Sequence, residues 1–202
     1  MSSSYLNRFI RHFITITKHR ILVCKGCFKI GLYYQGLTHD LSKYSPDEFL
    51  VGVKYFQGTR SPNNAEREAV GYSSAWLHHK GRNKHHYEYW IDYNTRGELP
   101  GEDILIPVEM PDRYLAEMVM DRIAASKVYK GKEYKDSDSL EYFLGGIETV
   151  PMHPETKRKL HRYLRILAKY GEEKTCRLIK YELKNGPYVP KSKRAASNQK
   201  DL

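Results

Sequence analysis

Apolar residues recur at helical spacing along most of the chain, and this pattern restricts the fold more than any other feature of the sequence. The spacing is three or four residues in two clear segments, which include Leu6, Phe9, Ile10, Phe13 and Ile14 near the start and Leu115, Met118, Val119, Ile123 and Val128 after Pro111. A stripe with this period is typical of an amphipathic helix. No convincing run of alternating strand character accompanies it, so we expect an all-α fold.

Capping and turn residues predict the ends of the helices. We expect a helix over residues 4–16 and a second one that begins at Thr17 and stops at Gly31. In Ser45-Pro46-Asp47-Glu48, Ser45 suits an N-cap, Pro46 the first helical turn and Glu48 the reciprocal position of a capping box. This motif predicts that a helix starts here and continues to about residue 57.

Turn residues and apolar periodicity also divide the rest of the chain into expected loops and helices. Residues 58–72 and 92–111 are rich in glycine, proline and asparagine. We expect a loop in the first range, where residues 65–70 can form a turn of helix, and in the second an irregular connection that can act as a lid or a substrate-binding excursion. A helix is expected to start at Ser73 or Ser74 and to carry the histidine-rich segment. One further helix is expected to begin at Pro111. Three more are expected over residues 139–144, 154–170 and 172–183, and Gly171 separates the last two.

Length and composition indicate one domain. A chain of 202 residues can bury a continuous core, and we assign residues 1–185 to a single helical domain. Residues 186–202 hold two prolines, four basic residues and almost nothing apolar, which predicts a flexible basic tail. No secretion signal and no apolar run of membrane-spanning length is evident, so we expect a cytoplasmic protein without a membrane partner. Three cysteines give no disulfide framework, and Cys24 and Cys27 are expected to be small core residues.

Histidines gather in one short segment. The ten residues LHHKGRNKHH, at positions 77–86, contain four of the nine histidines of the chain as the pairs His78-His79 and His85-His86. Four imidazoles in one window exceed what core packing requires, and imidazole is a frequent metal ligand. Either residue of a pair can be the ligand while its neighbour is a hydrogen-bond partner, so the choice between His78 and His79 stays open.

Further metal-binding side chains precede and follow this segment. His19, His39 and Asp40 lie before it, and Asp121 lies in the helix expected after Pro111. Neutral imidazoles with carboxylate oxygens suit divalent Mn, Fe, Mg, Ni or Zn ions. Each residue alone also fits a structural role, and Asp121 can equally be a buried salt-bridge partner of a neighbouring basic residue. The ordered set is the feature that indicates a metal centre.

The order His19, His39-Asp40, His78-His79, His85-His86, Asp121 resembles the HD superfamily of metal-dependent phosphohydrolases, which are helical bundles. The additional histidines are similar to those of its dinuclear members, which include cyclic-dinucleotide phosphodiesterases with a lysine three residues after the Asp, as Lys43 is here. The Gly-Tyr-Pro element of those phosphodiesterases is missing. More closely, the stretch from GLTHDLSKYSPDEF through LHHKGRNKHHYEYW resembles an uncharacterised family of bacteria and their viruses catalogued as a domain of unknown function. This resemblance covers roughly residues 18–130.

The resemblance implies a centre with two divalent ions. His19, His39 and Asp121 would hold one ion, and Asp40 would bridge it to the second. His85, His86 and one of His78 or His79 would complete the second ion. Asp40 and Lys43 would be the catalytic residues, with Lys43 contacting a phosphate oxygen. Asn83 and Glu88 are candidates for fixing imidazole tautomers.

The function we expect is therefore hydrolysis of a phosphate ester of a nucleotide or related small molecule. The HD scaffold also hosts di-iron oxygenases, which is the first alternative. The second alternative is a nucleic-acid-binding module with a structural metal, because residues 151–202 carry 14 Lys and Arg against 5 Asp and Glu, whereas residues 1–150 carry 20 against 19. Weak nucleic-acid binding through residues 154–202 is compatible with either function.

Overall fold

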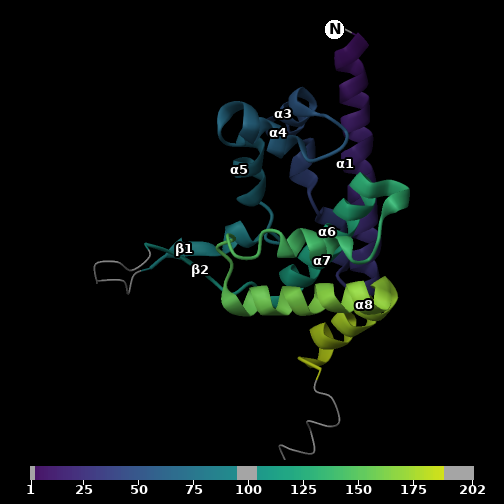
Figure 1. The fold of residues 1–202 in the computed structure, drawn as a ribbon, viewed down its shortest axis with the longest axis vertical. Coiled ribbons are helices and arrows are strands. Elements are labelled where there is room, and N and C mark those ends of the chain that lie inside the picture. The colour runs from purple at the N-terminus through teal and green to yellow at the C-terminus, as the bar shows by residue number, and fades with distance from the viewer. Residues whose placement is uncertain (1–2, 95–103, 189–202) are drawn as a thin grey trace, which may run out of the picture.

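The fold is all-α, as expected. The structure is a computed structural model that describes residues 3–94 and 104–188. Its described part contains eight α-helices and one small antiparallel sheet (Figure 1). The α-helices are α1 (Ser3–Ile30), α2 (Tyr33–Thr38), α3 (Pro46–Tyr55), α4 (Pro62–Val70), α5 (Ser74–Lys80), α6 (Asp112–Lys130), α7 (Asp138–Leu144) and α8 (Pro154–Asn185). Three 3₁₀ turns cover Leu41–Tyr44, Tyr87–Trp90 and Gly131–Glu133.

The main core lies where α1, α6 and α8 meet. Fully buried aliphatic side chains from these three helices form one cluster, which includes Val23 and Ile30 of α1, Leu115 and Val119 of α6, and Leu160, Leu164 and Leu167 of α8. A smaller cluster joins the first half of α1 to α3 through Ile16, Phe49 and Val53. Helices α3, α4 and α5 therefore form a second group, which packs beside α1 (Figure 1).

The first two expected helices are one continuous helix, so the prediction of a break at Thr17 is wrong. The hydroxyl of Thr17 lies 2.9 Å from that of Tyr44 and forms a tertiary hydrogen bond instead of capping a helix. Gly31 ends α1 as expected, with a φ of +85° that side chains disfavour. The expected helix boundary at Gly171 is a kink inside α8, where φ is +81°.

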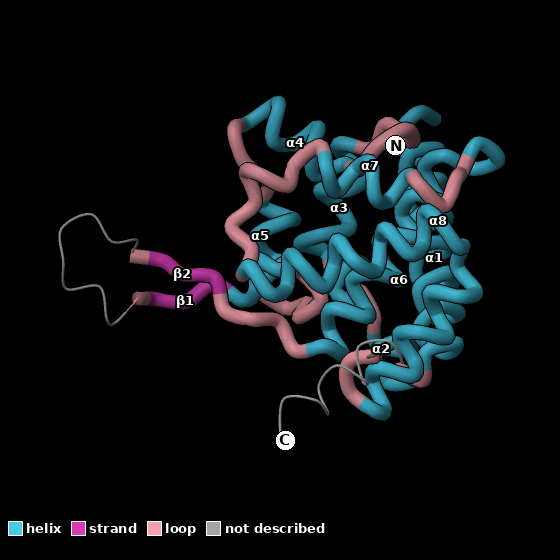
Figure 2. The backbone as a smooth tube through the Cα atoms, turned by 60° about the horizontal axis from the view of Figure 1, so that its bottom comes forward, coloured by secondary structure: helices cyan, strands magenta, loops and turns pink. Residues whose placement is uncertain are grey.

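Two short strands replace part of the expected irregular connection. Strands β1 (Ile91–Tyr93) and β2 (Leu105–Pro107) pair antiparallel, with Asp92 opposite Ile106. This ribbon projects from the helical body (Figure 2). Strands of three residues are too short to show an alternating pattern, which is why the sequence did not reveal them. The middle of the expected lid, residues 95–103, lies outside the described residues, as do residues 189–202 of the expected tail.

The expected loop over residues 58–72 also contains a full helix, α4. No helix in the described part of the chain is both long and apolar enough to cross a bilayer. All three cysteines are free thiols, and Cys27 and Cys176 belong to the main core. Burial raises the pKa of the Cys176 thiol to about 11, so this thiol stays protonated near neutral pH.

The periodic apolar residues at the start of α1 do not all face the core. Ile16 is 7% exposed against Phe49 and Val53, whereas Ile14 is 57% exposed. We expect Ile16→Ala to lower the free energy of unfolding by about 2–5 kcal/mol. Ile14→Ala, the matched control on the same helix, is expected to change it by less than about 0.5 kcal/mol. Urea denaturation followed by circular dichroism measures both, and equal losses would contradict the described packing.

Candidate metal centre

His39 and Asp40 lie in the turn between α2 and the 3₁₀ turn that follows it. His39 is the C-cap of α2, and Asp40 has the left-handed backbone conformation, with φ +52° and ψ +29°. Asp40 is the one described residue other than glycine with a positive φ. A strained backbone of this kind is frequent at functional sites. The turn brings the adjacent side chains together, with His39 Nε2 3.2 Å from Asp40 Oδ2.

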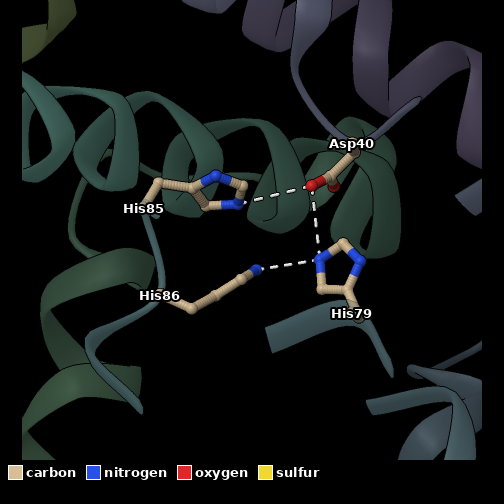
Figure 3. Close-up of side chains that lie close together, drawn as sticks. All are labelled: Asp40, His79, His85 and His86. Atoms are coloured by element: carbon tan, nitrogen blue, oxygen red, sulfur yellow. Dashed lines mark hydrogen bonds and ion pairs between the residues drawn. The ribbon is translucent and has the colours of Figure 1, made fainter. Parts of the chain in front are cut away.

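The carboxylate of Asp40 is the centre of the histidine cluster. It is fully buried, and its two oxygens face different imidazoles. Oδ1 lies 3.2 Å from His79 Nε2 and 3.4 Å from His85 Nε2, as Figure 3 shows. Oδ2 lies 3.2 Å from His39 Nε2 and 3.5 Å from His19 Nε2. One carboxylate therefore contacts imidazoles from four separate parts of the chain.

The structure brings seven of the eight predicted ligands into two groups that share Asp40. Within each group, one potential ligand atom per residue lies within 4.8 Å of the others, and either group could hold a metal ion. The first group is His19, His39, Asp40 and Asp121, and the second is Asp40, His79, His85 and His86. The first contains the residues expected around one ion, and the second contains those expected around the other.

His78 is the predicted ligand that the structure leaves outside both groups. Its Nδ1 lies 2.7 Å from Glu48 Oε1, and its Nε2 lies 3.5 Å from the exposed carboxylate of Asp47. His79 is oriented differently: Nδ1 lies 2.8 Å from Glu48 Oε2, and Nε2 faces Asp40. The same glutamate thus contacts both imidazoles of the pair but turns only His79 toward the cluster.

Glu48 has a different role from the one that the sequence indicated. Ser45 is the N-cap of α3 and Pro46 occupies its first turn, but Ser45 makes no side-chain capping bond and its hydroxyl is buried without a partner. The expected capping box is therefore absent at this helix start. The buried Glu48 carboxylate contacts the two imidazoles of α5 instead, which ties α3 to α5.

Glu117 on α6 is a site residue that the sequence reasoning missed. Its Oε1 lies 2.9 Å from His39 Nδ1 and 3.2 Å from His85 Nδ1, so one buried carboxylate holds an imidazole of each group. Glu117 lies one helical turn before Asp121 and therefore on the same face of α6. An acidic residue four positions before a predicted ligand, in an otherwise apolar helix face, is the signal that indicates this role.

The contacts of Glu48 and Glu117 determine where the imidazole protons lie. An ionised carboxylate only accepts hydrogen bonds, so a neutral imidazole that contacts one through Nδ1 carries its proton there. His39, His79 and His85 are all held in this way. Their Nε2 atoms then direct lone pairs toward Asp40. This is the carboxylate, histidine and metal arrangement found around many bound ions.

Several buried polar atoms in the cluster have no hydrogen-bond partner in the protein. Both Asp40 oxygens and His85 Nε2 are in this condition, although Asp40 forms ion pairs. In addition, His79 Nε2 lies only 2.9 Å from His86 Nε2. Because unsatisfied buried polar groups are costly, a cluster of them facing one point fits a bound cation. The residues present therefore suit a metal ion.

The ionisation of the cluster also fits metal binding. Burial would raise the pKa of Asp40, but the charge of His39 lowers it well below its usual range. At Asp121 burial is likewise outweighed by hydrogen bonds from two imidazoles, and the pKa is lowered. Burial and neighbouring imidazoles lower the pKa of His85 and His86, which keeps both neutral. Burial would lower the pKa of His39 and His79, but the charge of Asp40 raises it. The carboxylates and the imidazoles of His85 and His86 are therefore in the forms that bind metal ions, whereas His39 and His79 would release a proton on binding.

Lys43 and Asn83 lie beside the cluster. Lys43 Nζ is 2.6 Å from Asp40 Oδ2, so the ammonium group forms an ion pair with the buried carboxylate. Burial would lower the pKa of Lys43, but the charge of Asp40 raises it. Asn83 Nδ2 donates to the backbone oxygen of His79 at 2.8 Å. In the described ranges, Glu88 contacts Tyr87 rather than an imidazole.

Asp121 makes the contact expected of a ligand rather than that of a salt-bridge partner on α6. Its Oδ1 lies 3.0 Å from His19 Nε2. Lys127, a candidate partner on the same helix, forms its ion pair with Glu172, and the guanidinium of Arg122 lies over the Phe143 ring. The side chains of α6 therefore separate, with Asp121 directed toward α1 and the cluster.

Comparisons with known proteins add a family but no activity. No curated protein and no solved structure matches the chain. One family model, described as a family of unknown function (DUF5662), matches residues 8–166. This range includes both groups of potential metal ligands, together with Lys43, Glu48 and Glu117. Because the match covers more than three quarters of the chain, the protein belongs to this family of unknown function (DUF5662).

Proposed function

We propose that the protein is a metal-dependent phosphohydrolase with two divalent ions at the cluster, and that it acts on a phosphate ester of a nucleotide or related small molecule. The observation that carries the proposal is the position of Asp40. Its two buried oxygens face imidazoles of two different groups. A carboxylate in this position is suited to bridging two cations, which is the arrangement that phosphoester hydrolysis uses. The resemblance to the HD superfamily supports the same reaction.

The donor atoms narrow the choice of metal. The two groups together offer five imidazoles and two carboxylates. Mg²⁺ prefers oxygen ligands and keeps several waters, whereas imidazole suits Mn, Fe, Ni and Zn ions. We therefore favour one of the latter four. No cysteine belongs to either group within the described residues, which argues against a thiolate-selective metal.

The protein side chains would divide the work of catalysis. When bound, two cations would supply an activated water and stabilise negative charge on a phosphoryl group. Asp40 would contact both, and Glu48 and Glu117 would hold imidazoles in the tautomers that ligation needs. Lys43, whose ammonium group lies next to Asp40, would contact a phosphate oxygen of the substrate.

The nucleic-acid-binding alternative has less support from the contacts of α8. Several of its basic side chains already have acidic partners: Arg158 pairs with Glu155, Lys159 with Glu109 and Asp112, and Arg162 with Glu182. These pairs reduce the positive charge that α8 can present to a polyanion. Lys191, Lys193, Arg194 and Lys200 lie outside the described residues. The oxygenase alternative uses the same ligands and differs only in the reaction.

An activity panel distinguishes the two enzymatic functions. The purified protein, stripped of metal and reloaded separately with Mn²⁺, Fe²⁺, Ni²⁺ or Zn²⁺, is incubated with nucleotides and other phosphate esters while phosphate release and dioxygen consumption are measured. We expect phosphate release with at least one ion and no dioxygen consumption. Dioxygen consumption with iron and no phosphate release would replace the proposal with the oxygenase.

Replacement of the bridging carboxylate tests the metal centre itself. We expect Asp40→Asn to lose both ions, because the amide removes the charge that the two groups share. Asp47→Asn is the matched control, since Asp47 is exposed and lies beside the cluster without belonging to it. Elemental analysis of both variants gives the metal content, and circular dichroism shows whether each is folded. Full metal content in folded Asp40→Asn would refute the bridging role.

The adjacent residues His78 and His79 give a second matched pair. His79 Nε2 faces Asp40, whereas His78 contacts Glu48 and Asp47 outside the cluster. His79→Ala is expected to lower the metal content by about one ion per chain, and His78→Ala should retain both ions. The same loss in both variants, or a loss in His78→Ala alone, would show that the ligands are assigned wrongly.

Lys43 is expected to affect catalysis rather than metal binding. With the substrate that the panel identifies, Lys43→Met should keep its metal while kcat falls by about 100-fold or more, because the variant lacks a cation near the transferred phosphoryl group. Lys18→Met is the control, since Lys18 is an exposed lysine next to His19. An unchanged kcat in Lys43→Met would remove this residue from the catalytic machinery.

A further inference from the structure

A cavity of about 440 Å³ lies next to the candidate metal centre and shares His39 and His85 with it. Its walls come from α2, the segment before the second 3₁₀ turn and the first turns of α6. The described walls include His39, His85 and Glu117 but not Asp40 or Asp121. The walls therefore include two imidazoles together with the carboxylate that contacts both through Nδ1. Its volume is within the range of small-molecule sites.

Three basic side chains give this cavity its charge. Arg82 and Lys84 come from the loop between the two histidine pairs, and Arg113 comes from the first turn of α6. Arg82 donates a hydrogen bond to the backbone oxygen of His78. Because this oxygen carries no net charge, the contact does not neutralise the positive charge of Arg82. Glu117 is the one acidic residue in the described walls, and it already accepts from two imidazoles. The cavity is therefore suited to an anion.

Gln35 supplies an unused donor at the same cavity. Its side chain is 6% exposed, and its Nε2 has no hydrogen-bond partner in the protein. A buried amide donor without an acceptor is costly, so an acceptor from a ligand would relieve it. Tyr34 and Tyr114 add aromatic rings to the walls. Cations, a buried donor and aromatic rings together match a phosphate group attached to a small organic molecule.

We propose that this cavity is a binding site for the phosphate group of a small molecule, next to the metal centre. Arg113 and Arg82 contact the phosphate, Gln35 donates to one of its oxygens, and the tyrosines contact the rest of the ligand. The side chains that contact the ligand in this proposal belong to neither group of potential metal ligands, so it does not depend on the proposed hydrolase activity.

Titration calorimetry on metal-free protein in EDTA tests the site without interference from bound cations. The probes are inorganic phosphate, adenosine monophosphate and adenosine. We expect the monophosphate to bind and adenosine to bind at least about tenfold more weakly, because the charged group supplies most of the recognition. Equal affinity of phosphate and monophosphate would mean that the phosphate alone is recognised. Absence of binding by both, or adenosine binding as tightly as its monophosphate, would overturn the proposal.

Two variants locate the binding. Arg113→Gln and Gln35→Leu should each weaken binding of the monophosphate, the first by about tenfold or more because it removes a charge-assisted hydrogen bond. Arg177→Gln is the control, since Arg177 is an exposed arginine on α8 away from the cavity. Circular dichroism confirms that the variants are folded. Unchanged affinity in both cavity variants, or an equal loss in the control, would show that the ligand binds elsewhere.

Discussion

The burial of the Asp40 carboxylate is the constraint on which the centre depends. Removing a carboxylate from water costs several kcal/mol, and a left-handed conformation at a residue other than glycine costs about 1 kcal/mol or more. Both costs fall on Asp40, where ion pairs with Lys43 and the imidazoles offset the first. Imidazoles from α1, α2, α5 and the following loop converge on this carboxylate, together with the Lys43 ammonium. The proposed shared cation site would explain why these elements meet around a charged residue rather than an apolar one.

Two glutamates extend this constraint into the rest of the fold. Glu48 links α3 to α5, and Glu117 links α6 to the residues that follow α2 and α5. Each uses a carboxylate to hold more than one imidazole. The fold therefore fixes ring orientation before any ion binds, and preorganised ligands are what precise metal coordination requires. The main apolar core of α1, α6 and α8 supports the ends of this network, because α1 and α6 also carry His19 and Asp121.

The sequence predicted the helical class, and most of the side chains that gather at the candidate centre, better than the contacts around them. Helical periodicity and the glycines at positions 31 and 171 indicated real features of the fold, because both signals are local. Thr17 and Ser45 had good capping positions, but tertiary contacts of Thr17 and Glu48 replaced the expected caps. Glu117 has no local signal beyond its spacing from Asp121. Its role depends on which loops pack against α6, and a single sequence does not specify that.

The most direct test of the account is the position of bound metal. Crystals grown with Mn²⁺ and measured near its absorption edge locate the ions by anomalous scattering. The account predicts two peaks about 3.5–4 Å apart, with Asp40 between them and His19 and His86 on opposite sides. A single peak that Asp40 does not contact, or no peak among these residues, would contradict the central claim that Asp40 bridges two ions.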